Sequence, residues 1–126
     1  MRARRLLLVI LLSVTACHTA TPVAEGRPGL HDHTPHHGGV VAMVGMIHLE
    51  TVATAEGRVR VYLSDIWRRP LPLAGVDGSV TIRLPEGKQT LPLFIAGDAL
   101  EASGPRLRGP GVSVEVDLTR GDNRLR

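Results

Sequence analysis

Two segments of the sequence alternate strictly between polar and apolar residues. Residues 58–64 read RVRVYLS, and residues 112–118 read VSVEVDL. Residues 80–84 alternate less cleanly. This period of two is typical of β-strands with one buried face, and no segment after residue 38 keeps a helical period. The pattern therefore predicts an all-β chain.

Further apolar runs separated by turn residues extend this prediction. The additional strand candidates are residues 40–44, 47–54, 90–95 and 99–102. Turn signals rich in Gly, Pro and Asp lie at residues 55–57, 76–78, 85–88, 96–98 and 109–111. About seven short strands predict a small antiparallel β-sandwich, immunoglobulin-like in size. Because the chain has one Tyr, one Trp and one Phe, we expect a core of Val, Leu and Ile.

The register of one hairpin can be derived from the sequence. The segments 47–54 and 58–64 are separated by three residues that end in Gly57, which tolerates the left-handed conformation. A three-residue loop places Ile47 and Leu49 on the same face as the valines of the second strand. A two-residue loop would place them among the arginines instead, at a cost in core contacts. We therefore expect the three-residue loop.

This register has a consequence for two polar residues. It pairs His48 with Ser64 and Glu50 with Tyr62, on the face opposite the apolar one. Residues two positions apart on a strand project to the same side. We therefore expect His48 and Glu50 to lie side by side on an exposed face.

The N-terminal residues predict a bacterial lipoprotein. Residues 1–16 contain three arginines and then an unbroken apolar run, residues 6–12, which is too short to span a bilayer but typical of a secretory signal peptide. The sequence VTAC at residues 14–17 resembles a lipobox, in which Cys17 is lipidated. Two or more acyl chains would hold the mature protein stably on a membrane. An ordinary secretory signal followed by a chance cysteine is the alternative.

Removal of this signal changes the charge balance. The whole chain has a net charge of +3, but residues 17–126 contain twelve Lys and Arg and twelve Asp and Glu. We therefore expect no nucleic-acid partner. Cys17 is the only cysteine, so we expect no disulfide. His18 follows it in place of the aspartate that commonly retains lipoproteins in the inner membrane, which predicts the periplasmic side of the outer membrane.

Residues 17–38 read as the lipidated cysteine and a flexible tether, and residues 39–126 as the folded domain. The tether is rich in Pro and Gly and contains five of the six histidines. Within seven residues it gathers four imidazoles and one carboxylate, those of His31, Asp32, His33, His36 and His37. Dense histidine tracts favour metal binding, with zinc, copper or nickel as the usual ions. A solvated linker that serves only for reach and a pH-responsive spacer remain alternatives.

Methionine adds a preference for copper. Met43 and Met46 lie shortly after the histidine tract, and thioethers favour Cu(I). Core or turn residues at strand ends are the alternative interpretation. The sequence therefore predicts a copper or zinc ion without deciding between them.

Several short motifs carry a resemblance to a known domain. HGGV at 37–40, HLE at 48–50, VRVYLSD at 59–65, PLP at 70–72 and GSVT at 78–81 are the motifs concerned. Together they resemble a small periplasmic domain that occurs alone or at the front of the adaptor (membrane-fusion) proteins of copper, silver and other heavy-metal efflux pumps. The resemblance covers about residues 36–85. It implies an all-β domain that handles heavy metals in the periplasm.

By matching position, the resemblance nominates His37, His48 and Glu50 as metal ligands. His36 or Met43 would complete the shell, with His31 and His33 as further ligands that belong to this chain's longer tract. Glu50 could instead orient His48 or pair with an arginine. A heavy-metal efflux system is a candidate partner.

Enzymatic motifs are lacking in the sequence. It contains no Gly-x-Ser-x-Gly, no glycine-rich phosphate loop before a helix and no His-Glu-x-x-His. We therefore expect a membrane-anchored metal-binding lipoprotein, not an enzyme, that buffers or delivers copper or another heavy-metal ion. The alternative is a structural or interaction β-sandwich lipoprotein that docks on an envelope complex.

Overall fold

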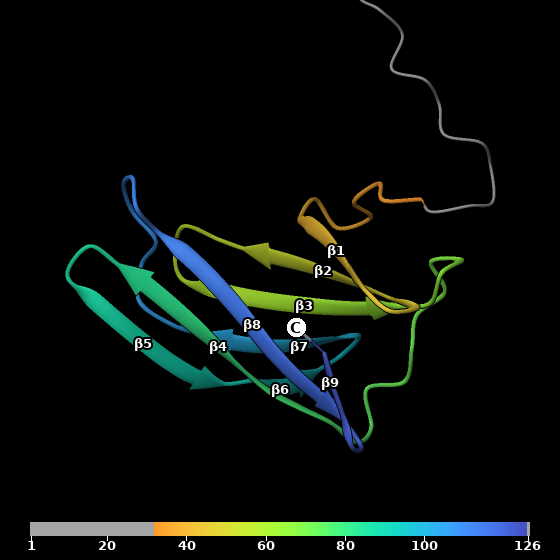
Figure 1. Cartoon of the computed structure of the whole chain (residues 1–126). Helices are drawn as coiled ribbons and strands as arrows, with labels where there is room; N and C mark the ends of the chain where they lie inside the picture. The colour runs from red at the N-terminus through yellow and green to blue at the C-terminus, as the bar shows by residue number, and fades with distance from the viewer. Residues whose placement is uncertain (1–31, 126) are drawn as a thin grey trace, which may run out of the picture.

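The computed structural model describes residues 32–125, so the predicted signal peptide, Cys17 and His31 lie outside the described residues. Residues 32–125 form nine β-strands in two antiparallel sheets (Figure 1). Within residues 32–125 there is no helix long and apolar enough to cross a membrane. The predicted all-β, sandwich-like fold is confirmed.

Most strands follow one another after short turns. In chain order they are β1 (Val40–Val44), β2 (Ile47–Ala53), β3 (Arg58–Ser64), β4 (Val76–Leu84), β5 (Gly87–Pro92), β6 (Phe94–Ala96), β7 (Ala99–Ser103), β8 (Ser113–Arg120) and β9 (Asn123–Leu125). Longer loops join β3 to β4 and β7 to β8. One sheet has the order β1-β2-β3-β7-β6 and the other the order β5-β4-β8-β9.

The core lies between the two sheets and is aliphatic, as the scarcity of aromatic residues predicts. The core cluster of buried residues is made of Leu49, Val59, Val61, Leu63, Leu73, Val76, Val80, Ile82, Leu93, Leu100, Ala102, Leu118 and Leu125. Trp67 and Phe94 are both exposed. Burial of these branched side chains is the main favourable term in the folding free energy.

The β2–β3 hairpin has the predicted register. His48 pairs with Ser64 and Glu50 pairs with Tyr62. Gly57 has the expected positive φ, at 96°, and its N–H donates to the oxygen of Thr54. The three-residue loop therefore sets which residues of both strands face the core.

Two turn and strand predictions are wrong. Residues 76–78 begin β4 instead of forming a turn, because Gly78 pairs with Leu118 so closely that an added Cβ would lie 2.4 Å from a Leu118 methyl carbon. The predicted strand 90–95 is divided between β5 and β6. Buried Leu93 separates them, and its N–H donates to the Gly78 oxygen as the chain passes from one sheet to the other.

The first described residues lie against the five-stranded sheet. We call residues 32–39 the N-terminal strap (orange in Figure 1). Gly39 approaches β2 so closely that an added Cβ would lie 2.3 Å from the main-chain oxygen of Thr51. The described end of the predicted tether, residues 32–38, thus packs on the domain, and the last residue of the N-terminal strap, Gly39, requires glycine.

Candidate functional site

The outer face of β1, β2 and β3 carries the polar residues that the sequence singles out. Met43, His48 and Ser64 form one cross-strand row, and Glu50 and Tyr62 belong to the next. His48 and Glu50 are only 0% and 2% exposed. The expectation that they lie on an exposed face is wrong, because the N-terminal strap and the loop after β3 cover them.

Glu50 holds the N-terminal strap by its main chain. Its carboxylate accepts the backbone N–H groups of His36 at 2.9 Å, His37 at 2.6 Å and Gly39 at 3.1 Å. The ring Nδ1 of His37 lies 3.1 Å from the same carboxylate. Glu50 therefore clamps the strap, and its oxygens are already engaged.

The Glu50 clamp requires an ionised carboxylate. Burial acts to raise the pKa of the Glu50 carboxyl, but the backbone N–H groups of His36, His37 and Gly39 stabilise the charged form and lower the pKa to about 2. Glu50 is thus a buried anion at neutral pH.

Arg68 supplies the positive charge that faces this anion. The turn after β3 is closed by Asp65, whose side chain accepts the backbone N–H of Arg69 at 2.9 Å. Arg68 adopts a positive φ of 64° in this turn, and its side chain is 6% exposed. The guanidinium lies 3.3 Å from the Glu50 carboxylate and donates to the Thr34 oxygen at 3.0 Å. Arg68 therefore ties the strap to the β3–β4 loop.

The two ring nitrogens of His48 differ in their hydrogen bonding. Nδ1 lies 3.0 Å from the main-chain oxygen of Asp65. Because a carbonyl oxygen only accepts, Nδ1 carries the proton in the neutral ring. Nε2 is buried and finds no hydrogen-bond partner among residues 32–125. The ring of His33 lies edge-on, with centroids 5.3 Å apart and planes at 64°.

The other predicted ligands have different surroundings. His37 stacks on Tyr62, with centroids 3.5 Å apart. His36 faces Asp32 at 3.5 Å and is partly exposed. The structure thus brings His33 and Met43 to His48, and it brings His37 to Glu50.

Carboxylates and imidazoles alone do not assemble a metal site in the described part of the chain. Among residues 32–125, no three side chains of the types His, Cys, Asp and Glu gather closely enough to hold a metal ion. His31, which the sequence nominates, lies outside the described residues. The predicted bridge of one metal across His37, His48 and Glu50 stays a prediction, and the hydrogen bonds of Glu50 give this residue another role.

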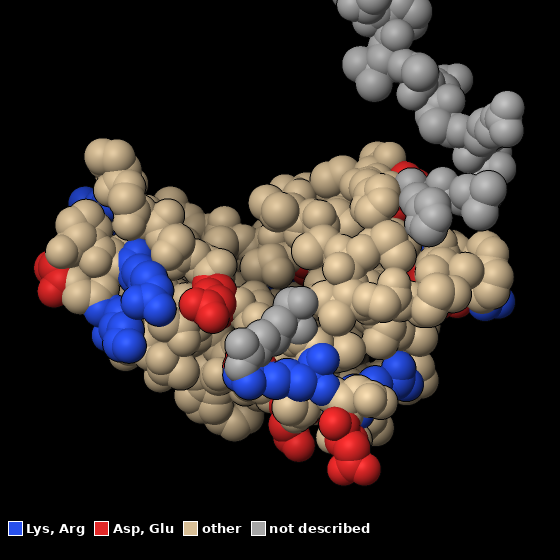
Figure 2. Space-filling view, in the orientation of Figure 1, with Lys and Arg blue, Asp and Glu red and all other residues tan. Residues whose placement is uncertain are grey.

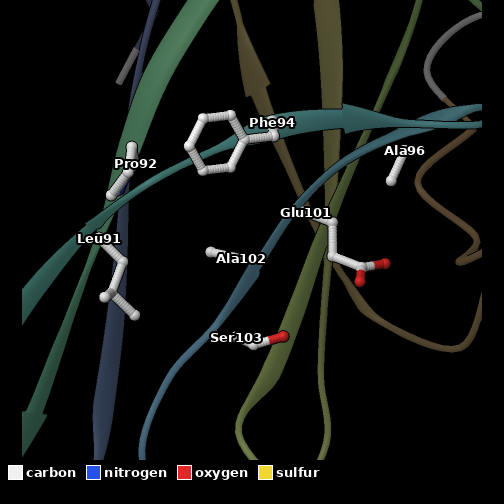
Figure 3. A pocket seen from close by; sticks show the side chains of 7 residues that line it. All are labelled: Leu91, Pro92, Phe94, Ala96, Glu101, Ala102 and Ser103. Atoms are coloured by element: carbon white, nitrogen blue, oxygen red, sulfur yellow. The ribbon is translucent and has the colours of Figure 1, made fainter.

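Two cavities differ in their chemistry. One of about 190 Å³ lies beside the Glu50 clamp and includes His36, His37, Tyr62 and Arg68 in its lining. The other, of about 360 Å³, lies between the end of β5 and strands β6 and β7 (Figure 3). Its lining is mainly apolar, and its one charged residue, Glu101, pairs with Arg60 at 3.3 Å. The polar and titratable groups therefore concentrate at the strap.

Sequence reasoning missed the roles of Arg68 and Asp65. Both belong to a polar loop without periodicity, where a charged residue is normally solvated. The only sequence signal is the short spacing from Asp65 to Arg69, which suits a turn closed by a side chain. The inward direction of Arg68 depends on a positive φ, which a sequence pattern does not predict for arginine.

Comparisons of the chain with family models, with curated proteins and with solved structures found no match.

Proposed function

We propose that the chain is a membrane-anchored periplasmic lipoprotein that binds copper or another heavy-metal ion and buffers it or hands it on. The observation that carries this proposal is the buried Nε2 atom of His48, which has no hydrogen-bond partner among the described residues while Nδ1 is held by Asp65. A buried polar atom without a partner costs free energy, which a bound ion would offset. A second group that fixes the ring is typical of histidines that bind metals.

The arrangement of the two rings fits a shared ion. With metal–nitrogen distances of about 2 Å and a tetrahedral angle, two imidazole centroids lie about 5 Å apart. The rings of His33 and His48 are 5.3 Å apart. Their edge-on contact therefore needs little movement to become a pair of ligands.

The Glu50 clamp explains how a residue of the strap reaches a buried strand residue. Three backbone N–H groups of the strap bind this carboxylate, and Arg68 binds both the carboxylate and the oxygen of Thr34. Thr34 directly follows His33, so these bonds restrict the position of the His33 ring. A clamped strap loses less conformational entropy on binding a metal than a free tail would lose.

The metal proposal is tested by titrating the full mature chain in detergent with Zn²⁺ and, without oxygen, with Cu(I). His48→Gln removes the imidazole and leaves a neutral amide of similar length in its place. We expect this variant to lose the tightest binding event. The control is His36→Ala, since His36 pairs with Asp32 at the surface. If His48→Gln binds both ions like the parent, the proposal is wrong.

The anchoring proposal has its own test. Cys17→Ser removes the thiol that accepts the lipid, so the precursor is expected to remain unlipidated and uncleaved by the lipoprotein peptidase. Membrane fractionation of the parent should place it with the outer membrane. A fully soluble mature parent would contradict the lipid anchor, whatever the metal result.

A second candidate function, docking on an envelope complex, is favoured by one surface feature. A groove of about 570 Å³ opens between β2 and β8, with Val40, Leu49, Val114 and Val116 in its lining (Figure 2). Val40 is 75% exposed. Apolar grooves of this kind are common at protein interfaces. Affinity capture from envelope extracts would test the docking function by comparing the parent with Val40→Asp. We expect the parent to capture a specific envelope partner that Val40→Asp does not.

A further inference from the structure

His48 on β2 has a thioether neighbour, the side chain of Met43, on the adjacent strand β1. Met43 of β1 pairs directly with His48, and Ser64 of β3 pairs with it from the other side. Directly paired residues of antiparallel strands project to the same face, with Cβ atoms about 4.5–5.5 Å apart. The partly buried Met43 side chain thus starts beside the His48 ring.

The free nitrogen of His48 points away from β3. The two ring nitrogens of an imidazole direct their hydrogen or lone pair to different sides of the ring. Since Nδ1 donates to the oxygen of Asp65, directly after β3, Nε2 is turned from that strand. The neighbour of β2 on its other side is β1, which carries Met43.

Hard oxygen ligands near this nitrogen are already engaged. The Glu50 carboxylate accepts the backbone N–H groups of the strap and faces Arg68. The Asp65 carboxylate accepts backbone N–H groups of its own turn and the side chain of Arg69. The His33 ring and the Met43 thioether, which also neighbour His48, are neutral and comparatively soft.

We infer that His48 Nε2, the His33 ring and the Met43 sulfur together form a site selective for monovalent copper. The inference rests on the proposed metal-binding function and names its ion. Thioether ligands favour Cu(I), whereas structural zinc sites use thiolate, imidazole and carboxylate. Three neutral ligands, of which His48 is fully buried, also suit a single positive charge, which costs less to desolvate than a divalent ion.

The test compares Met43→Leu with Met46→Leu in the full mature chain. Leucine conserves the volume of methionine and removes only the sulfur. Met46 lies in the β1–β2 turn and is 66% exposed, so it controls for the loss of a thioether elsewhere. Cu(I) affinity is measured without oxygen by competition with a chromogenic Cu(I) chelator, and Zn²⁺ affinity is measured by calorimetry.

We expect Met43→Leu to weaken Cu(I) binding about tenfold or more, with Zn²⁺ binding unchanged. Met46→Leu should leave both affinities unchanged. X-ray absorption should show a copper–sulfur contact in the parent that Met43→Leu removes. If Met43→Leu binds Cu(I) like the parent, or weakens Zn²⁺ equally, the copper selectivity is wrong, while loss of metal in His48→Gln would still support the proposed function. If the parent binds neither ion, both fail.

Discussion

The Nδ1 atom of His48 lies 3.0 Å from the main-chain oxygen of Asp65, although seventeen positions separate the two residues in the chain. This contact fixes the tautomer, because only a protonated Nδ1 can donate to a carbonyl. It also directs Nε2 away from β3. The direction of the Nε2 lone pair decides which other side chains can bind the same metal ion as His48.

The tautomer is the first prediction. In the metal-free protein at pH 8, long-range ¹H–¹⁵N correlation spectra should show His48 with a protonated Nδ1 and an unprotonated Nε2. His36, whose Nε2 faces the Asp32 carboxylate, should instead carry its proton mainly on Nε2. On addition of Cu(I), the Nε2 signal of His48 should shift most. A protonated Nε2 at His48 would contradict the assigned lone pair.

The second prediction concerns the pH dependence of stability. The Glu50 pKa of about 2 lies below the ordinary value of 4.5, so the folded state binds this proton less tightly than the unfolded state. The Glu50 contribution is therefore fully present above about pH 4.5 and is lost as the pH falls toward 2. The shift corresponds to about 3 kcal/mol.

Glu50→Gln tests this contribution by urea unfolding of metal-free protein at several pH values. The variant should lose about 3 kcal/mol at pH 7, since it leaves Arg68 as a buried charge without its partner. Its stability should also vary less with pH between 2 and 4.5. Glu115→Gln is the control, because the Glu115 side chain is largely exposed. Parallel pH profiles of Glu50→Gln and the parent would show that Glu50 is not the clamp.

The side on which His48 and Glu50 lie could be predicted from the sequence, but their burial could not. Period-two alternation and a glycine-ended loop fix the β2–β3 register locally, and the structure has this register. The cover over the two residues comes from the strap and from Arg68, more than ten positions away. A local pattern contains no information about such distant contacts.

For the candidate metal site, the sequence likewise predicts the residues but not their arrangement. His33, Met43 and His48 could all be nominated by residue type, since imidazole and thioether are known metal ligands. Their grouping could not, because it depends on strand pairing and on the folding back of the strap. Arg68 was missed because nothing in its neighbours predicts an inward arginine. Whether a metal binds stays a prediction.

The third prediction tests the two faces of β3. Val61 is fully buried in the core, so Val61→Asp should cost about 4 kcal/mol or more, or prevent folding. Arg60 lies on the outer face and pairs with Glu101 and Asp98. Partly exposed ion pairs contribute little, so Arg60→Ala should cost about 0.5 kcal/mol. Equal losses in urea unfolding would show that the assigned facing is wrong.

The fourth prediction concerns the glycine that sets the hairpin register. Gly57 has a φ of 96°, and an added Cβ would lie 2.2 Å from the main-chain oxygen of Pro105. Because that atom belongs to the backbone, it cannot move aside as a side chain could. The Gly57 oxygen also accepts the N–H of Gly104, which ties the β2–β3 loop to the segment after β7. Gly57→Ala should therefore cost about 2–3 kcal/mol.

Gly45→Ala is the matched control, because Gly45 also has a positive φ, of 59°, but an added Cβ would meet nothing within 4 Å. Gly45→Ala should lower the free energy of unfolding only by the conformational cost of a left-handed alanine, about 1 kcal/mol. The difference between the two variants in urea unfolding isolates the clash with Pro105. If Gly57→Ala costs no more than Gly45→Ala, the loop can move away from residue 105. The packing of the hairpin end against the segment after β7 would then contribute little to the free energy of unfolding.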